Sequence, residues 1–430
     1  MTNTVMTQDD RCSKAALRLM AITTVDATMG TFFEQQLRDL AAEGFEIHAV
    51  SSPGPRLDRI AMRSNQAGGS ITTHAVPMER QPNPTRDLVS LWNLYRLMRK
   101  VRPHVVHVHT PKAGLLGSIA ARLCGVKIRM YTIHGLPLET RQGLWRTVLE
   151  GFERTTCRLS TRVYAVSPSL EKVARDLRLC SSNKLSTLGD GSCSGIDLKR
   201  FDSRSIRPEA GRRGAGDRLR SELGIPSDAT VICFVGRIVR DKGIEVLADA
   251  WRSLEVHFPE LRLILCGPEE TADAASETSK KFLYGHPRVR KIERKGDEMP
   301  AVYAASDLCV LPTYREGLPQ VALEAGAMGL PVVGTKVTGV VDAVEHGTTG
   351  MLVAAGNAAE LAEALAQLVS DEGLRRTMGT AAREYVSSRF SSTRVNQLWV
   401  NEYRSRIREQ FADIQVASEA ASIATGAGRS

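Results

Sequence analysis

The sequence lacks the features that define several special classes of protein. Its 430 residues include eight cysteines, but no two form a C-x-x-C pair, which argues against a zinc site or a disulfide framework and suits a reducing cytosol. No run of about 18 apolar residues is present, so we expect no membrane-spanning segment. Residues 1–15 are polar, with Asp9 and Asp10 where a signal peptide needs its apolar region, so we expect a cytoplasmic protein.

Aromatic residues are also few, at 5%, but the composition is otherwise that of a globular protein. Apolar residues make up 42% of the chain and charged residues 24%, which excludes wholesale disorder. The length is that of two domains of about 200 residues each.

Acidic residues are scarce in the first half of the chain only. Residues 1–200 carry 28 Lys and Arg against 17 Asp and Glu, a charge of +11, whereas residues 201–430 carry −2. A basic half can attract nucleic acid, anionic lipid or a phosphorylated substrate. No helix-turn-helix, RRM-like or zinc-finger pattern accompanies the charge, so nucleic acid is not favoured. We expect a phosphorylated or membrane-borne partner, and a merely basic soluble surface is the alternative.

Apolar strand-like runs alternate with helix-like stretches in both halves, and their connections are short. This alternation predicts an α/β fold with two doubly wound domains in tandem, each with parallel strands covered by helices on both faces. Such domains place a ligand cleft between the carboxyl ends of their strands. The predicted strands are 17–25, 45–54, 104–110, 128–135, 229–237, 261–267, 306–313 and 330–335, and the predicted helices are 32–44, 88–101, 115–125, 243–254 and 319–329.

Residues 203–217 are rich in Arg, Gly and Ser, and this break in composition predicts a linker or a surface loop. We therefore expect an N-terminal domain over 1–202 and a C-terminal domain over 218–395. A further helix over 396–416 is expected to cross back to the first domain. The small and polar residues 417–430 are expected to be disordered.

Two strand ends in the second half favour a phosphorylated ligand. Gly236-Arg237 ends one strand, and Asp241-Lys242-Gly243 opens the next helix; two cations beside a helix N-terminus suit a diphosphate. Taken singly, Arg237 and Lys242 are more often solvated surface charges. Gly267 follows another apolar strand, where a base or a ribose would fit, although a plain turn is an equal alternative.

The segment Glu316-Gly317-Leu318-Pro319 lies between a predicted strand and a predicted helix. Pro319 is preset for the first helical position, and Gly317 lets the backbone approach a ligand closely. The free N–H groups there favour a phosphate or a sugar hydroxyl. Glu316 lies in the loop and Glu324 about one and a half turns inside the helix, so the two carboxylates can contact different parts of one long ligand. A helix N-terminal acid and a polar-face residue are the alternatives.

These motifs together resemble the retaining GT-B glycosyltransferases of family 4. The second half carries Gly236-Arg237, Asp241-Lys242-Gly243, and Glu316 and Glu324 within YREGLPQVALEAGAMGLPVVGT (314–335). The first half is similar to the bacterial polysaccharide-assembly branch through HTPKAGLLGSIAARLCGV (109–126), TIHGLP (132–137) and AVSPSL (165–170). The resemblance covers the chain from about residue 17 to about residue 411, with several motifs in the right order across both domains.

The resemblance implies a GT-B fold, with two Rossmann-like domains facing across a cleft, and roles for the second-half residues. Arg237 and Lys242 would bind the donor diphosphate, beside Gly236, and Gly267 would lie on the base side of the donor. Glu324 would hold the ribose hydroxyls. Glu316, with the Gly317–Leu318 backbone, would hold the transferred sugar.

The resemblance also implies roles for the first domain. His134 would approach the sugar from across the cleft, although a structural, hydrogen-bonded histidine is the alternative. The loop Thr28–Thr31 around Gly30 would cover the phosphates, with one glycine where many relatives have two. Lys112, in a Thr-Pro-Lys loop at a strand's carboxyl end, would contact the phosphate of the acceptor.

The expected reaction is transfer of a sugar from a nucleotide-sugar, most simply a UDP-sugar, with retention of anomeric configuration. The expected acceptor is a saccharide or a polyprenyl-diphosphate-linked saccharide. No D-x-D motif is present at the predicted diphosphate site, where it would bind a divalent cation. Arg237 and Lys242 are therefore expected to replace that cation, and no cofactor is expected. No residue stands out as a covalent nucleophile, and the usual front-face mechanism of the family is adopted.

Three other functions are open to a chain of this kind. A nucleotide-sugar 2-epimerase on the same fold would turn over the donor alone. A dehydrogenase would need a dinucleotide fingerprint, but Gly189-x-Gly191-x-x-x-Gly195 has the wrong spacing and does not follow the first strand. A basic nucleic-acid-binding protein would need no nucleotide-sugar, and its binding would fall steeply with salt.

The stretch LWRTVLEGFERTTCR (144–158) is cationic and has apolar residues at helical spacing. Packing of this stripe in the core is the commoner arrangement, and an interfacial helix is the alternative. With the charge of the first half, the second alternative places the protein peripherally at the inner face of the cytoplasmic membrane. The apolar positions are Leu144, Trp145, Val148, Leu149 and Phe152.

Overall fold

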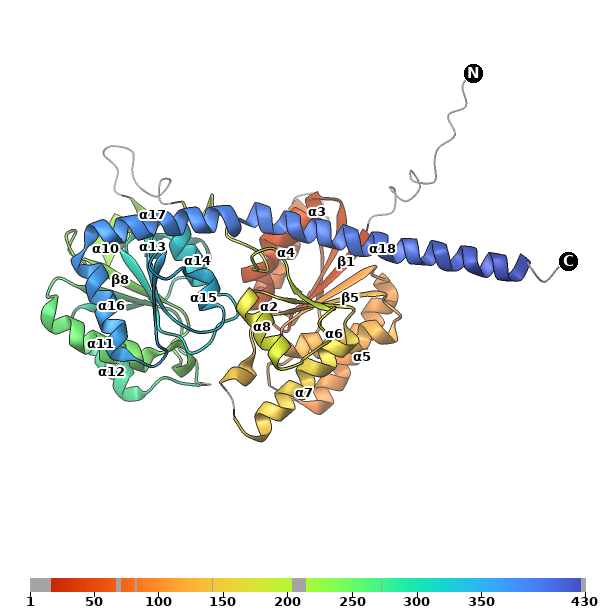
Figure 1. The fold of residues 1–430 in the computed structure, drawn as a ribbon, viewed down its shortest axis with the longest axis horizontal. Coiled ribbons are helices and arrows are strands. Elements are labelled where there is room, and N and C mark those ends of the chain that lie inside the picture. Colours follow the sequence, from red (N-terminus) through yellow and green to blue (C-terminus); the bar gives the residue numbers. More distant parts are fainter. Residues whose placement is uncertain are drawn as a thin grey trace, which may run out of the picture.

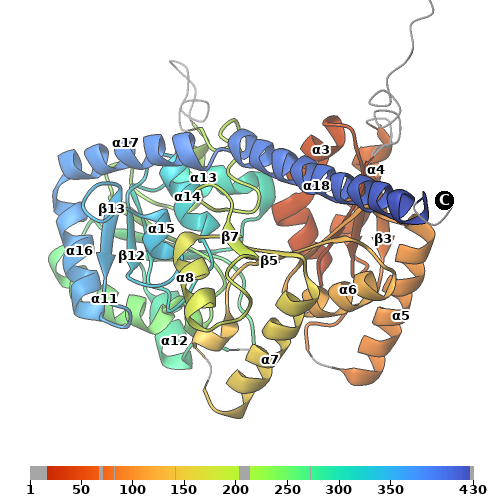
Figure 2. The same cartoon turned by 45° about the vertical axis from the view of Figure 1, so that its right-hand side comes forward.

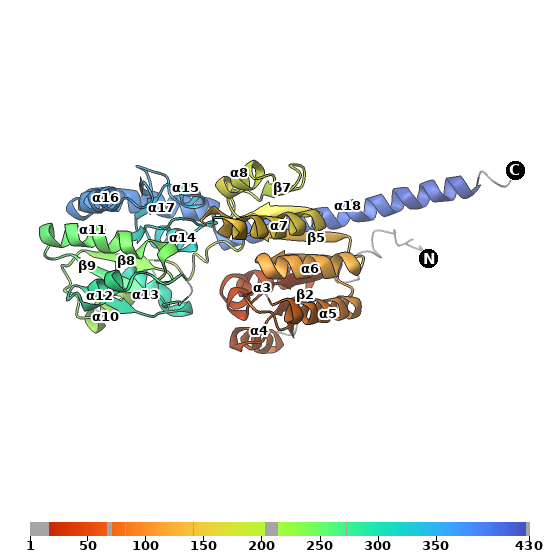
Figure 3. The ribbon, with the colours of Figure 1, turned by 90° about the horizontal axis from the view of Figure 1, so that it is seen from below.

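Two parallel β-sheets, each with helices on both faces, organise the chain in the computed structural model (Figures 1 and 3). The structure describes residues 17–66, 71–81, 83–140, 142–202, 214–271 and 273–426. Within these residues the first sheet has the order β3-β2-β1-β4-β5-β6-β7 and the second the order β10-β9-β8-β11-β12-β13. In each sheet the strand order reverses at its first strand, β1 or β8, as in doubly wound folds.

The first domain contains seven described strands, all paired in parallel. They are β1 (Leu17–Ile22), β2 (Phe45–Ser51), β3 (Ile71–Ala75), β4 (Val105–His109), β5 (Ile128–Ile133), β6 (Arg162–Ala165) and β7 (Leu185–Thr187). Its helices are α2 (Asp26–Thr28), the π-helix η1 (Met29–Phe33), α3 (Glu34–Ala42), α4 (Pro55–Gln66), α5 (Pro84–Val101), α6 (Pro111–Leu123), the 3₁₀ helix η2 (Pro137–Glu139), α7 (Leu144–Leu159) and α8 (Pro168–Asp176).

The second domain repeats the pattern with six described strands, again all parallel. They are β8 (Val231–Val235), β9 (Arg262–Cys266), β10 (Val289–Ile292), β11 (Leu308–Leu311), β12 (Val332–Thr335) and β13 (Gly350–Val353). The helices are α10 (Ala215–Glu222), η3 (Arg240–Lys242), α11 (Ile244–His257), α12 (Glu277–Gly285), η4 (Gly296–Glu298), α13 (Met299–Ala304), α14 (Gln320–Ala327), α15 (Val340–Ala343), α16 (Ala358–Ser370), α17 (Glu372–Arg389) and α18 (Ser392–Gly426).

Helix α18 leaves the second domain and runs along the first, as Figures 1 and 2 show. Its Tyr403 hydroxyl lies 2.6 Å from Nδ1 of His107 on β4, and the Tyr403 ring packs edge-on against Phe45 of β2. Trp399, one turn earlier, is 2% exposed. The predicted α/β architecture with a C-terminal helix that returns to the first domain is therefore confirmed.

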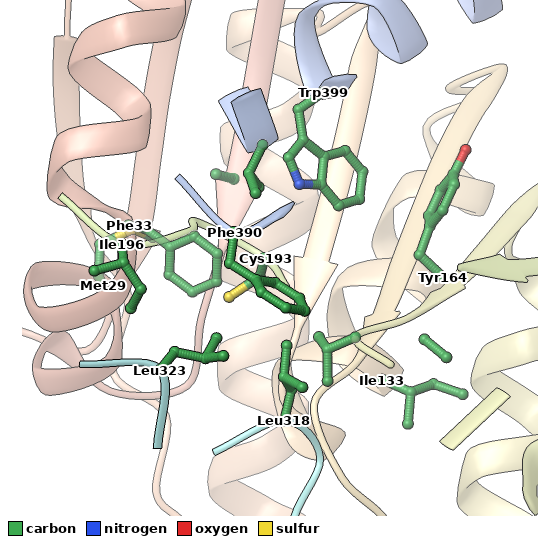
Figure 4. Packing of buried hydrophobic residues seen from close by; sticks show 14 of the residues in the cluster. Met29, Phe33, Ile133, Tyr164, Cys193, Ile196, Leu318, Leu323, Phe390 and Trp399 are labelled. Atoms are coloured by element: carbon green, nitrogen blue, oxygen red, sulfur yellow. The ribbon is translucent and has the colours of Figure 1, made fainter. Parts of the chain in front are cut away.

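One apolar cluster contains residues of both domains (Figure 4). Leu318 and Leu323 of the second domain belong to the same cluster as Phe33 of η1 and Ile133 of β5. Phe390, between α17 and α18, joins them. Burial of apolar surface in a shared core favours one fixed arrangement of the two domains.

The structure differs from the sequence-based expectation at Gly30. The predicted Thr28–Thr31 loop is instead a helical turn, in which α2 passes directly into η1. A Cβ at Gly30 would lie 2.7 Å from Cβ of Arg56 on α4, and Arg56 also donates from Nη1 to the carbonyl of Ala27 at 3.0 Å. The glycine therefore permits close packing of two helices, which local sequence alone does not reveal.

Two helices extend into segments that the sequence predicted to be non-helical. They are α10, in the predicted linker, and α18, in the predicted disordered tail. Residues 203–213 of the predicted linker lie outside the described residues, but α10 already begins at Ala215, where Asp217 accepts a hydrogen bond from the Gly214 N–H at 3.2 Å. At the other end, residues 417–426 of the predicted disordered tail continue α18. Alanine, with its high helix propensity, recurs in this segment. Residues 427–430 lie outside the described residues.

Candidate functional site

Loops from the two domains meet at Gly317, beyond the carboxyl ends of β5 and β11. A Cβ at Gly317 would overlap the carbonyl oxygen of His134, so only glycine allows this approach. The buried Ser167 hydroxyl donates to the Gly317 carbonyl at 2.6 Å. The structure thus brings together the predicted His134 of the first domain and the Glu316–Leu318 segment of the second, and we call this region the junction.

Lys242 and Glu316 form an ion pair at the junction. Lys242 ends η3 and Glu316 follows β11, so the pair joins the loops after two adjacent strands of the second sheet. Both side chains are largely buried, at 19% and 14% exposed. Next to them, Arg315 binds Asp241 at 2.7 Å and donates to the Thr140 hydroxyl of the first domain at 2.9 Å.

Arg237 lies at the same edge of the second sheet but is more exposed, at 46%. Its Nη1 binds Oε2 of Glu270 at 2.6 Å, and Arg80 of the first domain lies 3.6 Å from Oε1 of the same carboxylate. Both predicted diphosphate-binding cations are therefore paired with carboxylates of the chain itself.

The turns at Gly236 and Gly267 pack against each other behind Arg237. Gly267 has φ +149°, and a Cβ there would overlap the Gly236 carbonyl oxygen. Gly236 donates from its N–H to the Cys266 carbonyl at 2.9 Å. Glycine is required at Gly267 because the backbones after β8 and β9 touch there without a side chain between them, and Gly236 is favoured by its own φ of +155°.

Glu324 lies on α14, one face of which is buried in the second domain. The Tyr303 hydroxyl donates to Oε2 of Glu324 at 2.7 Å. Burial raises the pKa of the Glu324 carboxyl to about 7, and the hydrogen bond from Tyr303 and the positive charge of Arg200 oppose this rise. Neither Tyr303 nor Arg200 was indicated by the sequence, because both come from segments without a recognisable motif.

The imidazole of His134 is held by a second histidine. Its Nε2 lies 3.0 Å from Nδ1 of His109, the last residue of β4. Burial lowers the pKa of His134 to about 4, so the ring is neutral at physiological pH. Phe33 of η1 packs edge-on against His134, with ring centroids 5.8 Å apart. His109 is the first residue of the motif HTPKAGLLGSIAARLCGV (109–126), but the sequence assigned it no role.

Within the described part of the chain, Gly30 and Lys112 form no hydrogen bond or ion pair with the other candidate residues. Gly30 is buried in η1 beneath Arg56. Lys112, near the N-terminus of α6, binds Asp87 of α5 at 2.7 Å and is only 13% exposed. Its ammonium group thus joins two helices of the first domain.

No group of three or more His, Cys, Asp or Glu side chains placed to hold a metal ion is found among the described residues. Nor does any helix within that part of the chain have the length and apolar character needed to cross a membrane.

Comparison with known proteins settles the family. The model "Glycosyl transferase 4-like domain" matches residues 27–189, and "Glycosyl transferases group 1" matches residues 216–385. The capsular polysaccharide biosynthesis glycosyltransferase CapM of Staphylococcus aureus is 34% identical over 374 residues, which make up 87% of this chain and 93% of that protein. The chain belongs to the family 4 glycosyltransferases of the GT-B fold, in the bacterial polysaccharide-assembly branch.

Two further similarities agree with this assignment. The UDP-Gal:alpha-D-GlcNAc-diphosphoundecaprenol alpha-1,3-galactosyltransferase of Escherichia coli is 26% identical over 79% of this chain and 84% of that protein. The crystal structure of Anabaena Alr3699/HepE in complex with UDP and glucose has a TM-score of 0.71, with 20% identity, and covers 90% of this chain and 100% of that one. At 20% identity, this similarity shows only that the two chains share a fold.

In each domain of this glycosyltransferase, a tyrosine binds a carboxyl whose pKa is raised. The Tyr131 hydroxyl donates to Glu153 at 2.8 Å in the first domain, as Tyr303 does to Glu324 in the second. Burial raises the pKa of Glu153 to about 7 as well. Glu153 lies on α7, away from the junction, and so provides a matched control for Glu324.

The two buried carboxyls should make the folded chain less stable as the pH rises. Each binds its proton more tightly in the folded than in the unfolded chain, so the free energy of unfolding should fall between pH 4.5 and about 7. Glu153→Gln and Glu324→Gln should each reduce this fall, and the double variant should reduce it further. Melting temperatures measured across this range test it, with Glu363→Gln on the exposed face of α16 as control. Identical slopes in all variants would contradict the assignment.

Proposed function

We propose that this glycosyltransferase moves a sugar from a UDP-sugar to a lipid-linked saccharide, with retention of anomeric configuration, in the biosynthesis of a surface polysaccharide. The observation that carries the proposal is the junction, where His134 of one domain lies against the Glu316–Gly317 segment of the other. A donor placed there is contacted by both domains. The names of the S. aureus and E. coli relatives support the acceptor class, and UDP in the Anabaena structure supports the donor class.

In this proposal, Lys242 and Arg237 bind the donor diphosphate and stabilise the nucleoside diphosphate as it departs. They follow β8, and charge-assisted hydrogen bonds to phosphate are stronger than neutral ones. Glu324 accepts hydrogen bonds from the ribose hydroxyls, and Glu316 from the transferred sugar. Positioning and electrostatic stabilisation of an oxocarbenium-like sugar supply the rate enhancement.

Product analysis with UDP-glucose and UDP-galactose, each with and without a polyprenyl-diphosphate-linked saccharide, tests the reaction. Transfer predicts release of UDP and a glycosylated lipid only when the acceptor is present. A 2-epimerase would change the donor without any acceptor. Turnover of both donors alone, without a lipid-linked product, would therefore contradict the proposal. The anomeric configuration of the product decides between retention and inversion.

Removal of either cation should weaken donor binding and turnover together. A charge-assisted contact is worth about 1.5–3 kcal/mol, so Lys242→Ala or Arg237→Ala should weaken UDP binding by roughly 10- to 150-fold. Calorimetry with UDP measures the effect. Lys172→Ala is the control, because this lysine is also ion-paired, to Asp176, but on the exposed face of α8. Wild-type affinity in both site variants would refute the assignment.

Turnover should survive removal of divalent metal ions. The physical reason is that Lys242 and Arg237 supply two positive charges where a metal would otherwise neutralise the leaving diphosphate. Initial rates in excess EDTA should match those in Mg²⁺ or Mn²⁺. Loss of turnover in EDTA that only metal restores would show that the two cations are insufficient.

Helix α7 supports docking of the first domain on an anionic membrane. Of the apolar stripe predicted there, Leu149 packs against the core, whereas Leu144, Trp145 and Phe152 are 80%, 64% and 43% exposed. Core packing therefore accounts for only part of the stripe. Cationic side chains beside exposed apolar ones are typical of interfacial helices. Figure 3 shows α7 beside α6 on the first domain.

The protein should float with anionic vesicles and much less with neutral ones. Each basic residue near an anionic surface is worth about 1 kcal/mol, so Arg146→Glu and Arg154→Glu should weaken recovery, as should added salt. Arg376→Glu, an exposed charge reversal on α17 of the second domain, is the matched control. Equal recovery with both vesicle types, or recovery with neither, would exclude electrostatic docking.

A further inference from the structure

Four aromatic side chains form a continuous buried path from α18 to the junction. The Tyr403 hydroxyl lies 2.6 Å from Nδ1 of His107, whose Nε2 lies 2.7 Å from the Thr132 hydroxyl. The His107 ring packs against the His109 ring, with centroids 4.1 Å apart. His109 in turn binds His134 through Nδ1. Polar groups buried in this way are held in one arrangement when their partners are satisfied.

His109 has little freedom to move. Its side chain is 3% exposed, and its ring lies between Phe33, at a centroid distance of 4.3 Å, and His107. His109 is paired with Thr132 of β5, and His134 is two residues beyond Thr132, so both histidines lie on the same face at the sheet edge. The hydrogen bond between them is therefore a product of strand register.

The residue after His109 adopts an unusual backbone conformation. Thr110 has φ +69°, a region that a β-branched residue rarely enters. Its hydroxyl lies 2.7 Å from that of Thr24 and accepts from the Thr24 N–H at 3.2 Å, which holds the turn. Such strained positions persist only where the surrounding structure fixes them, and they concentrate at functional sites.

The hydrogen bond between His109 and His134 determines what the second ring nitrogen of His134 can offer to a ligand. A neutral ring has one N–H and one nitrogen lone pair, so the partner of one nitrogen determines what the other nitrogen offers. Burial lowers the pKa of both rings, and the 3.0 Å contact therefore contains a single shared N–H. No described residue hydrogen-bonds Nδ1 of His134, so this is the nitrogen available to a ligand.

We infer that His109 is a positioning residue for His134: it fixes the orientation and the tautomer of that ring, and so determines whether Nδ1 presents a donor or an acceptor to the sugar at the junction. This inference rests on the proposed function for the identity of the ligand. The tautomer of His134 can be measured without turnover, so this inference and the proposed function can be tested separately.

Two substitutions separate the hydrogen bond from the packing. His109→Phe keeps an aromatic ring between Phe33 and His107 but removes the nitrogen that binds His134. His109→Asn restores a polar atom near the position of Nδ1. The control is His48→Phe, because His48 and His74 form the same Nδ1–Nε2 contact at 3.0 Å on β2 and β3, away from the junction.

Nitrogen-15 NMR of histidine-labelled protein reads the tautomer directly. We expect a single tautomer of His134 in the wild type and in His48→Phe, and a mixture in His109→Phe. In turnover assays, kcat should fall by roughly 10- to 100-fold in His109→Phe, as when a group that orients a functional histidine is lost, and should recover largely in His109→Asn. UDP affinity should be unchanged, since the diphosphate-binding residues are in the other domain.

An unchanged His134 tautomer in His109→Phe would overturn the inference, whatever the activity. So would an equal loss of kcat in His109→Phe and His109→Asn with His134 in its wild-type tautomer, because the effect would then lie in packing alone. If the wild-type chain transfers no sugar from a UDP donor, the proposed function fails while the tautomer measurement still decides the role of His109. Should His109→Phe not fold, His109→Leu replaces it, because leucine also lacks the nitrogen that binds His134.

Discussion

The backbone contact at Gly317 is the constraint on which the rest of the junction depends. On one side the segment lies against the His134 carbonyl, and on the other a Cβ at Gly339 would overlap the Gly317 carbonyl itself. The Ser167 hydroxyl fixes the same carbonyl by a buried hydrogen bond. Because neighbouring backbones enclose Gly317 without intervening side chains, the Glu316–Gly317 backbone has a defined position relative to His134. A larger residue would separate the domains at this point.

Helix α18 also holds the two domains together. The chain leaves the second domain at Phe390, crosses to the first, and buries Trp399 and Tyr403 against its sheet. Hydrogen bonds beside the junction also join the two domains. The Thr338 hydroxyl donates to Glu139 at 2.6 Å, and the Ser169 N–H donates to Asp342 at 3.1 Å. The arrangement of the domains is thus set by the core and by polar contacts at the same time.

The sequence predicted the fold and the strand ends that carry the candidate residues, because in parallel α/β domains each strand end is marked locally by an apolar run followed by Gly or Pro. It did not predict what those residues touch. Glu270 is 33 residues from Arg237, and Tyr303 is 21 residues from Glu324. Such partners depend on strand order and on loop paths between distant segments. For the same reason, local composition at Gly30 indicated a loop where close packing against Arg56 requires a helix.

The pairing of both cations with carboxylates has a consequence for selectivity. A diphosphate that binds Lys242 and Arg237 must compete with Glu316 and Glu270, which already satisfy them. A single negative charge gains little from such an exchange, because it replaces one ion pair by another. In the proposed binding mode, a ligand with two linked phosphates engages both cations, and the second contact is then intramolecular. If Glu316 turns instead to a sugar hydroxyl when it leaves Lys242, its hydrogen-bonding capacity is also used. With the roles proposed for these residues, the ion pairs therefore favour a ligand that carries diphosphate and sugar together over free phosphate or free sugar, which is the discrimination that a nucleotide-sugar transferase requires.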